Sequence, residues 1–215
     1  MKFNRDMLLL YAVTDRKPSA EKTLYDQVKE AILGGVTMVQ LREKNLDEEE
    51  LVREAVEMRK LCHSFGVPLI INDNVDAAIK SGADGVHVGI EDMPVSEIRK
   101  RVGRDFIIGA TAKTVEQAKS AEISGADYLG VGAVFPSPTK TNAVRITNEQ
   151  LREIASSVRI PIVAIGGINS ENALEIRNSG ASGIAVVSAL FSAEDIKAAA
   201  EKLRETAREV AESGE

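Results

Sequence analysis

The sequence predicts a (β/α)8 TIM barrel that occupies residues 1–215 as a single domain, and three observations support this fold class. Short apolar runs rich in β-branched residues alternate with longer segments of helical period. A weak repeat marks several junctions between them, and no linker rich in Pro, Ser or Gly divides the chain. The 215 residues allow about 27 residues for each of eight strand–helix units, which is the size that such a unit needs.

Apolar runs predict eight strands, at 8–14, 38–43, 68–72, 85–89, 106–111, 128–134, 161–166 and 183–188. Helical periodicity predicts helices near 19–33, 47–64, 74–81, 94–102, 114–124, 147–157, 170–179 and 193–212. Because a helix follows nearly every strand, neighbouring strands pair in parallel. An open doubly wound sheet is the alternative, but it usually has five or six strands and a single Gly-rich nucleotide turn.

The repeat reads SGADGV at 81–86, SGADYL at 124–129 and SGASGI at 179–184, with GGVTMV at 34–39 as a relative. In each copy a glycine ends a helix and the small residues after it lead into a strand. The repeat therefore indicates one strand–helix unit that recurs along the chain.

Composition and charge exclude several classes of protein. The chain has 33 acidic and 27 basic residues, a net charge of -6, and therefore no broad basic surface for nucleic acid or an anionic membrane. The apolar run at 7–13 is too short to span a bilayer and lacks a signal cleavage site, so it is interpreted as a buried strand. Cys62 is the only cysteine, which indicates a reducing compartment, by default the cytoplasm.

Polar side chains gather at the end of the second predicted strand. Gln40, Arg42 and Lys44 recur at period two and are expected to face the barrel axis, whereas Val39 and Leu41 are expected to pack outward against helices. The alternative is a solvated strand end with surface ion pairs. Catalytic residues of such barrels collect where strands run into the following loops, which favours a functional interpretation.

Carboxylates follow the third and fourth predicted strands. Asn72 and Asp73 end one strand, and Glu91 and Asp92 follow the next. Mg²⁺ typically takes one or two protein carboxylates and completes its shell with water and substrate phosphate oxygens. The alternative is that these residues only form turns and helix N-caps.

Two further loops are suited to anions. The loop 135–143 carries hydroxyl groups, two prolines and Lys140, although it could be only a stiffened turn. Gly166–Gly167 and Val187–Ser188 end the last two strands, where barrels often bind phosphate, and Ser192 is a candidate N-cap. No zinc spacing or nucleophile elbow is present, and His87 is interpreted as a core or supporting residue.

With QLREK, IND, GVHVGIED, VFPSPTK, AIGGI and VVS in this order, the chain resembles the thiamine-phosphate synthase (thiamine-phosphate pyrophosphorylase) family from 11–15 to 186–190. The resemblance implies a Mg²⁺-dependent transferase that joins an aminopyrimidine methyl diphosphate to a thiazole phosphate, which can also be carboxylated, and releases pyrophosphate. The partners would be small molecules, with no nucleic acid and no membrane, and a homo-oligomer stays open.

Carried over by position, the resemblance implies three groups of site residues. The pyrimidine diphosphate site would comprise Gln40, Leu41, Arg42, Glu43, Lys44, Asn72, Thr111 and Lys140, with Arg42, Lys44 and Lys140 as the catalytic cations. The Mg²⁺ ligands would be Asp73 and Asp92. The thiazole phosphate site would comprise Ser137, Pro138, Thr139, Gly167, Val187 and Ser188.

The implied mechanism is departure of pyrophosphate to leave a pyrimidinylmethyl cation, which the thiazole nitrogen captures. The sequence departs from the family at Thr111, where Ser is usual, at Lys113, where His is frequent, and at Asn74, where Arg is common. Two alternatives stay open: a thiazole tautomerase of the same fold, and a binder of thiazole phosphate without catalysis. The intact Asn72, Asp73, Asp92 and Lys140, together with the lack of a His in the GATAKT loop, favour the synthase over the tautomerase, and nothing in the sequence suggests a partner or output domain for a binder.

Overall fold

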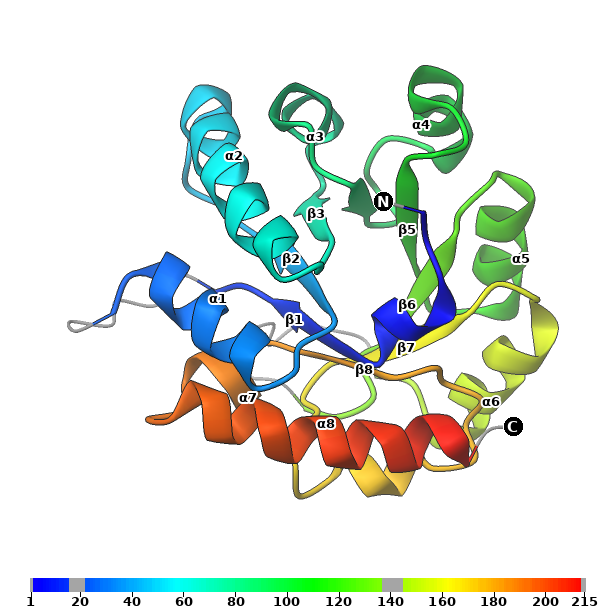
Figure 1. Cartoon of the computed structure of the whole chain (residues 1–215). Coiled ribbons are helices and arrows are strands. Elements are labelled where there is room, and N and C mark those ends of the chain that lie inside the picture. The colour runs from blue at the N-terminus through cyan, green and yellow to red at the C-terminus, as the bar shows by residue number, and fades with distance from the viewer. Residues whose placement is uncertain (1, 16–21, 137–144, 214–215) are drawn as a thin grey trace.

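The computed structural model describes residues 2–15, 22–136 and 145–213 and contains a closed barrel of eight parallel strands. The strands follow one another around the barrel in chain order, and the ring closes where β8 pairs with β1 (Figure 1). The strands are β1 Leu10–Val13, β2 Met38–Leu41, β3 Leu69–Asn72, β4 Gly85–Val88, β5 Ile107–Ala112, β6 Tyr128–Gly132, β7 Ile162–Ile165 and β8 Ile184–Val186. The predicted fold class is confirmed, and each strand overlaps its predicted range.

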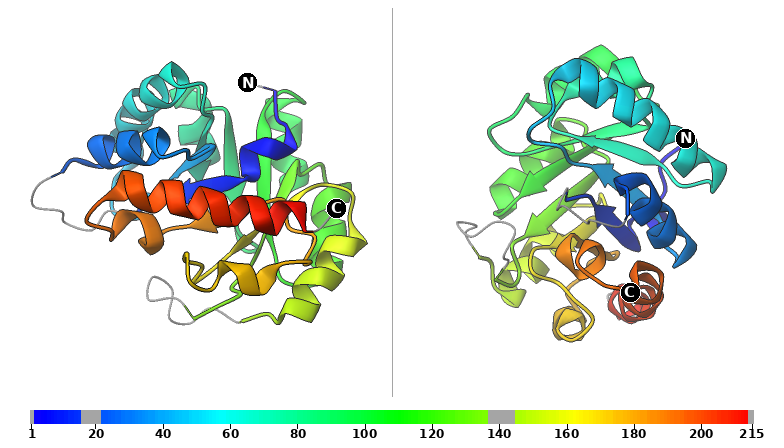
Figure 2. Two further views of the ribbon diagram at one scale, coloured as in Figure 1. Left: turned by 60° about the horizontal axis from the view of Figure 1, so that its bottom comes forward. Right: turned by 90° about the vertical axis from the view of Figure 1, so that its left-hand side faces the viewer.

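Helices surround the ring of strands (Figures 1 and 2). They are α1 Leu24–Leu33, α2 Glu48–Ser64, α3 Val75–Ser81, α4 Val95–Val102, α5 Val115–Ile123, α6 Asn148–Ser157, α7 Ser188–Phe191 and α8 Ile196–Glu212. Capping defines where several of them begin; in α2, for example, the side chains of Asp47 and Glu50 accept each other's backbone N–H groups. Short 3-10 helices η1 and η2 span Arg5–Leu8 and Ala173–Ile176.

Alternate residues of each strand face two different apolar layers. Tyr11, Met38, Ile70 and Ile107 belong to a small cluster that fills the barrel interior. Their neighbours in sequence belong to a larger cluster between the strands and the helices. Val39 and Leu41 pack in this outer layer, as the period-two pattern predicts.

The sequence repeat has a structural role at the amino ends of the strands. The fourth residue of each repeat copy, Thr37, Asp84, Asp127 or Ser182, lies just before an even-numbered strand. Its backbone N–H donates to a carbonyl near the start of the preceding odd-numbered strand. These bonds are Thr37 to Leu10, Asp84 to Leu69, Asp127 to Ile108 and Ser182 to Ile162, at 2.9, 2.9, 2.7 and 2.8 Å.

In three copies of the repeat, the side chain of that fourth residue also accepts a hydrogen bond from the backbone N–H of the strand residue whose carbonyl it contacts. Thr37 accepts from Leu10 at 2.9 Å, Asp84 from Leu69 at 2.9 Å, and Asp127 from Ile108 at 2.7 Å. In the fourth copy Ser182 accepts instead from the Arg5 guanidinium at 2.9 Å. The repeat thus ties pairs of strand–helix units together, because it satisfies backbone groups that the ladder leaves open.

Two predicted helical features are wrong. The segment predicted as a helix at 170–179 forms only η2, because Asn169 and Asn172 hydrogen-bond to nearby backbone N–H groups and so favour a turn. Ser192 is not the N-cap of the last helix. It is the C-cap of α7, and the side chain of Asp195 caps α8 by accepting from the Ala198 N–H.

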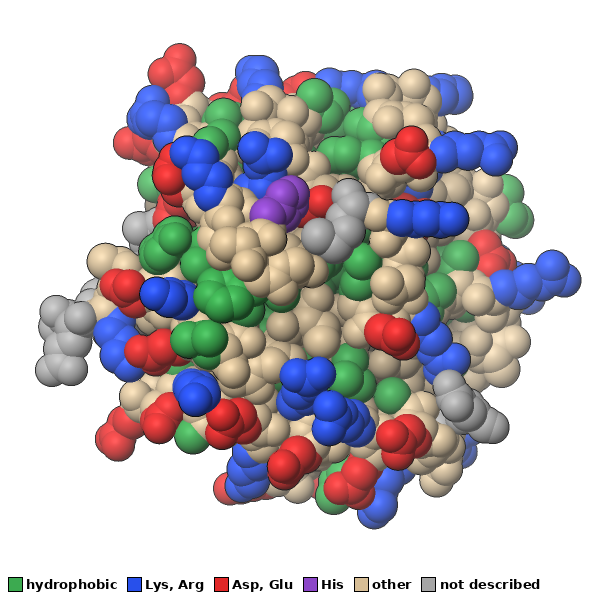
Figure 3. Space-filling model, in the orientation of Figure 1, with side chains coloured by type: hydrophobic (Ala, Val, Ile, Leu, Met, Phe, Trp, Pro, Cys, Tyr) green, Lys and Arg blue, Asp and Glu red, His purple; other side chains and the backbone are tan. Residues whose placement is uncertain are grey.

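The amino ends of the strands face the viewer in Figure 1, where η1 lies across the opening of the barrel. On this face acidic and basic side chains are interspersed (Figure 3). Within the described ranges, no helix combines the length and apolar character needed to cross a membrane.

Candidate active site

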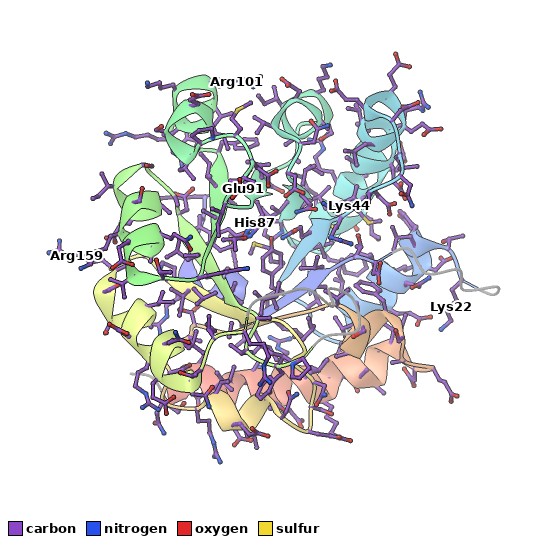
Figure 4. The ribbon with its side chains drawn as sticks, turned by 180° about the vertical axis from the view of Figure 1, so that it is seen from behind. Lys22, Lys44, His87, Glu91, Arg101 and Arg159 are labelled. Atoms are coloured by element: carbon purple, nitrogen blue, oxygen red, sulfur yellow. The ribbon has the colours of Figure 1, made fainter. Side chains whose placement is uncertain are left out.

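A cavity of about 200 Å³ opens at the carboxyl ends of the strands, the end seen in Figure 4. All eight strands contribute to its wall, one residue of each being Tyr11, Gln40, Asn72, His87, Thr111, Gly130, Val163 and Ala185. The wall has two chemically different sides. Strands β2 to β5 and their loops supply amide, guanidinium, imidazole, hydroxyl and ammonium groups, whereas β6 to β8 supply glycines and small or branched apolar side chains.

A chain of hydrogen bonds between buried side chains crosses the floor of the cavity. The amide nitrogen of Gln40 donates to the Tyr11 hydroxyl at 2.7 Å, and this hydroxyl lies 2.8 Å from that of Tyr128. The Tyr128 hydroxyl lies 3.1 Å from Nδ1 of His87, whose Nε2 lies 3.1 Å from Oγ1 of Thr111. Five polar side chains from five strands therefore form one network.

Burial keeps this network uncharged at neutral pH. It lowers the pKa of His87 to about 4, an effect that the carboxylate of Asp92 opposes only in part. It also raises the pKa of the Tyr11 and Tyr128 hydroxyls well above the usual value. The floor therefore offers dipoles and hydrogen bonds rather than charges.

Two glycines make room for the network. A Cβ atom on Gly109 would lie 2.3 Å from the Tyr128 hydroxyl and 2.5 Å from Nδ1 of His87. A Cβ atom on Gly130 would lie 2.9 Å from Cε1 of the same imidazole. Any larger residue at 109 would separate Tyr128 from His87, so glycine in the middle of β5 has a steric cause.

At the rim, Lys44, Asn72 and Asp73 form a connected group. The Lys44 ammonium lies 2.9 Å from one Asp73 carboxylate oxygen, and the Asn72 side-chain amide donates to the other at 2.8 Å. Asp73 has a left-handed backbone with φ of 62°, and its N–H donates to the His87 carbonyl at 2.8 Å. This connection links the rim to the floor, and Figure 4 shows His87 within the ring of strands and Lys44 on the loop outside it.

The end of β2 differs from the period-two prediction. Gln40 is buried in the floor and Arg42 lines the cavity. The regular strand ends at Leu41, so the alternation does not extend to Lys44, whose exposed side chain reaches Asp73 instead. Leu41 packs its side chain in the outer layer, and Glu43, two residues further on, is half-buried.

Asp92 lies on the loop after β4, where its carboxylate accepts a hydrogen bond from the Gly89 N–H at 2.6 Å. Together with Asp73 it provides hard oxygen donors on neighbouring loops. Among the described residues no group of three or more His, Cys, Asp or Glu side chains is arranged to hold a metal ion. Two carboxylates suffice for Mg²⁺ only if water and substrate oxygens complete its shell.

The glycine pair after β7 passes tightly against the loop after β6. A Cβ atom on Gly166 would lie 2.5 Å from that of Ala133, and one on Gly167 would lie 2.2 Å from the Pro136 carbonyl. Both glycines have positive φ, at 103° and 66°. Gly166 and Val187 line the cavity, and Ser188 begins α7 directly after Val187.

Some residues that line the cavity were not predicted, and some predicted site residues are not described by the structure. Ser137, Pro138, Thr139 and Lys140 lie outside the described residues. Sequence reasoning missed Tyr11 and Tyr128 and did not recognise Lys113 as part of the cavity wall. The signal for the two tyrosines was the inward phase of their strands, which buried apolar residues share, so the pattern alone could not separate them from the core.

The chain is similar in sequence to proteins of one kind. The family described as thiamine monophosphate synthase matches residues 10–190. The thiamine-phosphate synthase of Ruminiclostridium cellulolyticum is 50% identical over 196 residues, which are 91% of this chain and 93% of that protein. The thiamine-phosphate synthase of Pyrococcus furiosus is 45% identical over 206 residues, which are 96% of this chain and 98% of that protein.

A solved structure gives the same result. The structure of thiamine phosphate pyrophosphorylase from Pyrococcus furiosus superposes with a TM-score of 0.87 at 43% identity. The superposition covers 96% of this chain and 98% of that one. The likeness therefore extends over nearly the whole chain.

Proposed function

Because the chain belongs to the thiamine monophosphate synthase family, it is a transferase that makes thiamine phosphate, and we propose how its cavity does so. An aminopyrimidine methyl diphosphate and a thiazole phosphate, or its carboxylated form, bind side by side and release pyrophosphate, and with the carboxylated form CO2 must also leave. The observation that carries this proposal is the division of the cavity wall into a polar side and an apolar side. A charged diphosphate and a thiazole ring need these two environments.

The polar side suits the pyrimidine diphosphate. Arg42, Asn72 and Thr111 line it, and Gln40 presents its side chain from the floor. Lys113 adds a cation where the family frequently has His, and Lys44 stands on the rim. Lys140, by resemblance, completes the cations around the leaving group. Guanidinium and ammonium groups are the usual partners of phosphate oxygens.

We place Mg²⁺ at Asp73 and Asp92. Their oxygen atoms match the preference of this ion, and the scarcity of further ligands among the described residues leaves positions for water and diphosphate oxygens. When bound, the ion would neutralise part of the negative charge on the departing pyrophosphate. The ion pair between Asp73 and Lys44 must loosen for this, and Lys44 would then be free to contact the diphosphate.

The apolar side suits the thiazole phosphate. Val163, Ile165 and Ala185 provide surface for the ring. Gly167, Val187 and Ser188 follow the ends of β7 and β8, where barrels often bind phosphate through backbone N–H groups. By resemblance, Ser137, Pro138 and Thr139 contribute from the adjoining loop.

The reaction then proceeds without covalent attack by the protein. The bond between the methylene carbon and the diphosphate oxygen breaks, and its electron pair leaves with pyrophosphate. The thiazole nitrogen donates its lone pair to the resulting carbocation. The protein residues bind and orient both substrates and stabilise the leaving group. The hydroxyls of Tyr11 and Tyr128 stay protonated, so the floor presents no phenolate to compete with the thiazole nitrogen.

The direct test is to mix both substrates with and without Mg²⁺ and to measure pyrophosphate and thiamine phosphate together. We expect equal amounts of both products, only when both substrates and the metal are present. Each substrate alone serves as the control. Thiazole isomerisation without pyrophosphate would indicate a tautomerase, and binding of thiazole phosphate without turnover would indicate a non-catalytic binder; either result contradicts the proposal.

We also propose that residues 1–215 act as one barrel domain in the cytoplasm. The only cysteine, Cys62, is buried in α2 and has no disulfide partner in the chain, which supports a reducing compartment.

A further inference from the structure

The hydrogen-bond network in the floor of the cavity has a direction. Each member offers a limited set of donors and acceptors, and Gln40 fixes the first link because its amide nitrogen faces the Tyr11 hydroxyl at 2.7 Å. Tyr11 must therefore accept this bond and give its own hydrogen to another group. Within the described part of the chain, the hydroxyl of Tyr128, 2.8 Å away, is its remaining partner.

The direction of the next two hydrogen bonds, from Tyr128 to His87 and from His87 to Thr111, follows in the same way. Tyr128 accepts from Tyr11, so its hydrogen goes to Nδ1 of His87 at 3.1 Å. Nδ1 then acts as an acceptor, and a neutral imidazole carries its single hydrogen on the other nitrogen, Nε2. Nε2 donates to Oγ1 of Thr111 at 3.1 Å. If Nδ1 carried the hydrogen instead, one tyrosine hydroxyl would lose its acceptor.

A hydroxyl of Tyr11 or Tyr128 without an acceptor for its hydrogen would destabilise the folded protein. Tyr128 is fully buried, and Tyr11 is 1% exposed, so water cannot replace a missing partner. A buried donor without a partner costs about 1–3 kcal/mol, which corresponds to a preference of about 5-fold to 150-fold for the satisfied arrangement. Among the described residues no carboxylate is hydrogen-bonded to the ring of His87. The charge of Asp92 favours a second proton, but the burial of the ring outweighs it.

The surroundings hold the network in place. The ring of Tyr128 packs edge-on against that of Tyr11, with centroids 5.9 Å apart, and it stacks on Phe3 at 5.7 Å. Gly109 and Gly130 provide the space that lets the hydroxyl of Tyr128 and the imidazole of His87 meet. These contacts leave the rings of Tyr128 and His87 little freedom to move apart and break the hydrogen bond between them.

We propose that Tyr11 and Tyr128 are positioning residues which, through His87 with its hydrogen on Nε2, oblige the Thr111 hydroxyl to point its own hydrogen into the cavity. Oγ1 of Thr111 already accepts from His87, and this is its only hydrogen bond to a described residue. Its hydrogen is therefore available to an oxygen or nitrogen acceptor on the substrate. This role deepens the proposed function and rests on Thr111 contacting the pyrimidine diphosphate.

The first test measures the position of the hydrogen on His87 in the free enzyme. The chain has only 2 histidines, so a ¹⁵N-histidine sample gives two imidazoles, and His63→Gln assigns them. We expect Nε2 of His87 to resonate as the protonated nitrogen and Nδ1 as the acceptor. A hydrogen on Nδ1 would mean that the network runs the other way, and it would overturn the proposal. This readout needs no substrate, so it is independent of whether the proposed reaction occurs.

The second test reverses the network from its far end. Gln40→Glu replaces an amide donor with a carboxylate of nearly the same shape, which can only accept when ionised. Tyr11 would then donate to the introduced carboxylate, Tyr128 to Tyr11, and Nδ1 of His87 to Tyr128. We expect the hydrogen on His87 to move to Nδ1 at a pH where the ¹³C shift of the introduced carboxylate shows it ionised.

The matched control interrupts the network in the middle. In Gln40→Glu combined with Tyr128→Phe, the change should no longer reach His87, and the hydrogen should stay on Nε2. If the hydrogen moves equally in both variants, the effect travels through space and the relay is wrong. If it moves in neither, Gln40 does not set the direction, which also contradicts the proposal.

Discussion

Lys44 and Asp73 lie 29 positions apart in sequence, yet the Lys44 ammonium is 2.9 Å from the Asp73 carboxylate, at the junction between the rim and the floor of the cavity. The neighbouring Asn72 amide holds the other carboxylate oxygen, and the Asp73 backbone bonds to His87. If Asp73 holds Mg²⁺ as proposed, its carboxylate is already oriented for the ion, and Lys44, once displaced from it, can contact the proposed diphosphate.

We expect Asp73→Asn to raise the Mg²⁺ concentration needed for half-maximal activity by about tenfold or more, because one anionic ligand is lost. Asn tolerates the left-handed backbone at this position, with φ of 62°, so the fold should stay intact. The measurement is a Mg²⁺ titration of initial rate. Glu91→Gln removes a charge from the adjoining loop and serves as the control. An equal shift in both variants would indicate a general charge effect instead of metal ligation.

Lys140→Ala should lower turnover by about 10² to 10³, if this residue stabilises the leaving pyrophosphate as a single electrostatic donor does elsewhere. Lys140 lies outside the described residues, so kinetics provides the test. Lys60→Ala, which removes an exposed lysine paired with Glu57 on α2, is the matched control and should leave turnover unchanged. Near-normal turnover of Lys140→Ala would contradict its role.

The activity should depend on the hydroxyl of Thr111 and not on its methyl group. We expect Thr111→Ser to keep kcat/KM within about threefold, and Thr111→Val to lower it by about 10² or more, because only Val removes the donor while keeping the shape. Steady-state kinetics with the pyrimidine diphosphate as the varied substrate measures both. Equal activity of the two variants would show that the hydroxyl does not contact the reacting substrate.

Asp127→Ala should destabilise the barrel without a direct effect on the cavity. The Asp127 carboxylate accepts from the Ile108 N–H and from the Arg99 guanidinium, each at 2.7 Å. Removing it leaves donors of a part-buried contact without a partner, which costs about 1–3 kcal/mol. Urea unfolding measures the loss, with the exposed Asp105→Ala as the control. An unchanged midpoint would show that the repeat contact contributes nothing to stability.

Cys62 should resist alkylation in the folded chain. Burial raises the pKa of its thiol to about 12, and the thiolate is the reactive form. Raising the pH from 7 to 9 should therefore speed iodoacetamide labelling of the unfolded chain while the folded chain stays largely unlabelled. Above about pH 8.5 the thiol ionises in the unfolded chain but not in the folded one. The free energy of unfolding therefore falls as the pH rises. Equal labelling rates would contradict this.

The fold was predictable because it depends on local and periodic signals. The eight apolar runs and the glycines of the SGAD repeat occur in the order that a parallel barrel requires, and the structure places a strand on each run. The predicted helix at 170–179 was wrong, and its absence was not predictable from periodicity. Its asparagines bond to nearby backbone groups, and this local competition outweighed a helical pattern.

Within the site, the sequence indicated residues whose polarity is unusual for a strand end. Gln40 and Asn72 are examples, and both line the cavity, as does Thr111, which the family resemblance indicated. The predicted alignment of Lys44 with Gln40 did not hold, because β2 ends before the alternation reaches it. Where Lys44 points is decided by its contact with Asp73 from another strand.

The sequence by itself determined the barrel, the end that carries the site and the family to which the chain belongs, because periodicity, glycine positions and motif order are properties of the chain. The tertiary structure alone decided which buried polar groups meet. Tyr11 and Tyr128 lie 117 positions apart, and their hydroxyls come within 2.8 Å because β1 and β6 face each other across the closed barrel. No local pattern encodes a distance across a closed ring of strands.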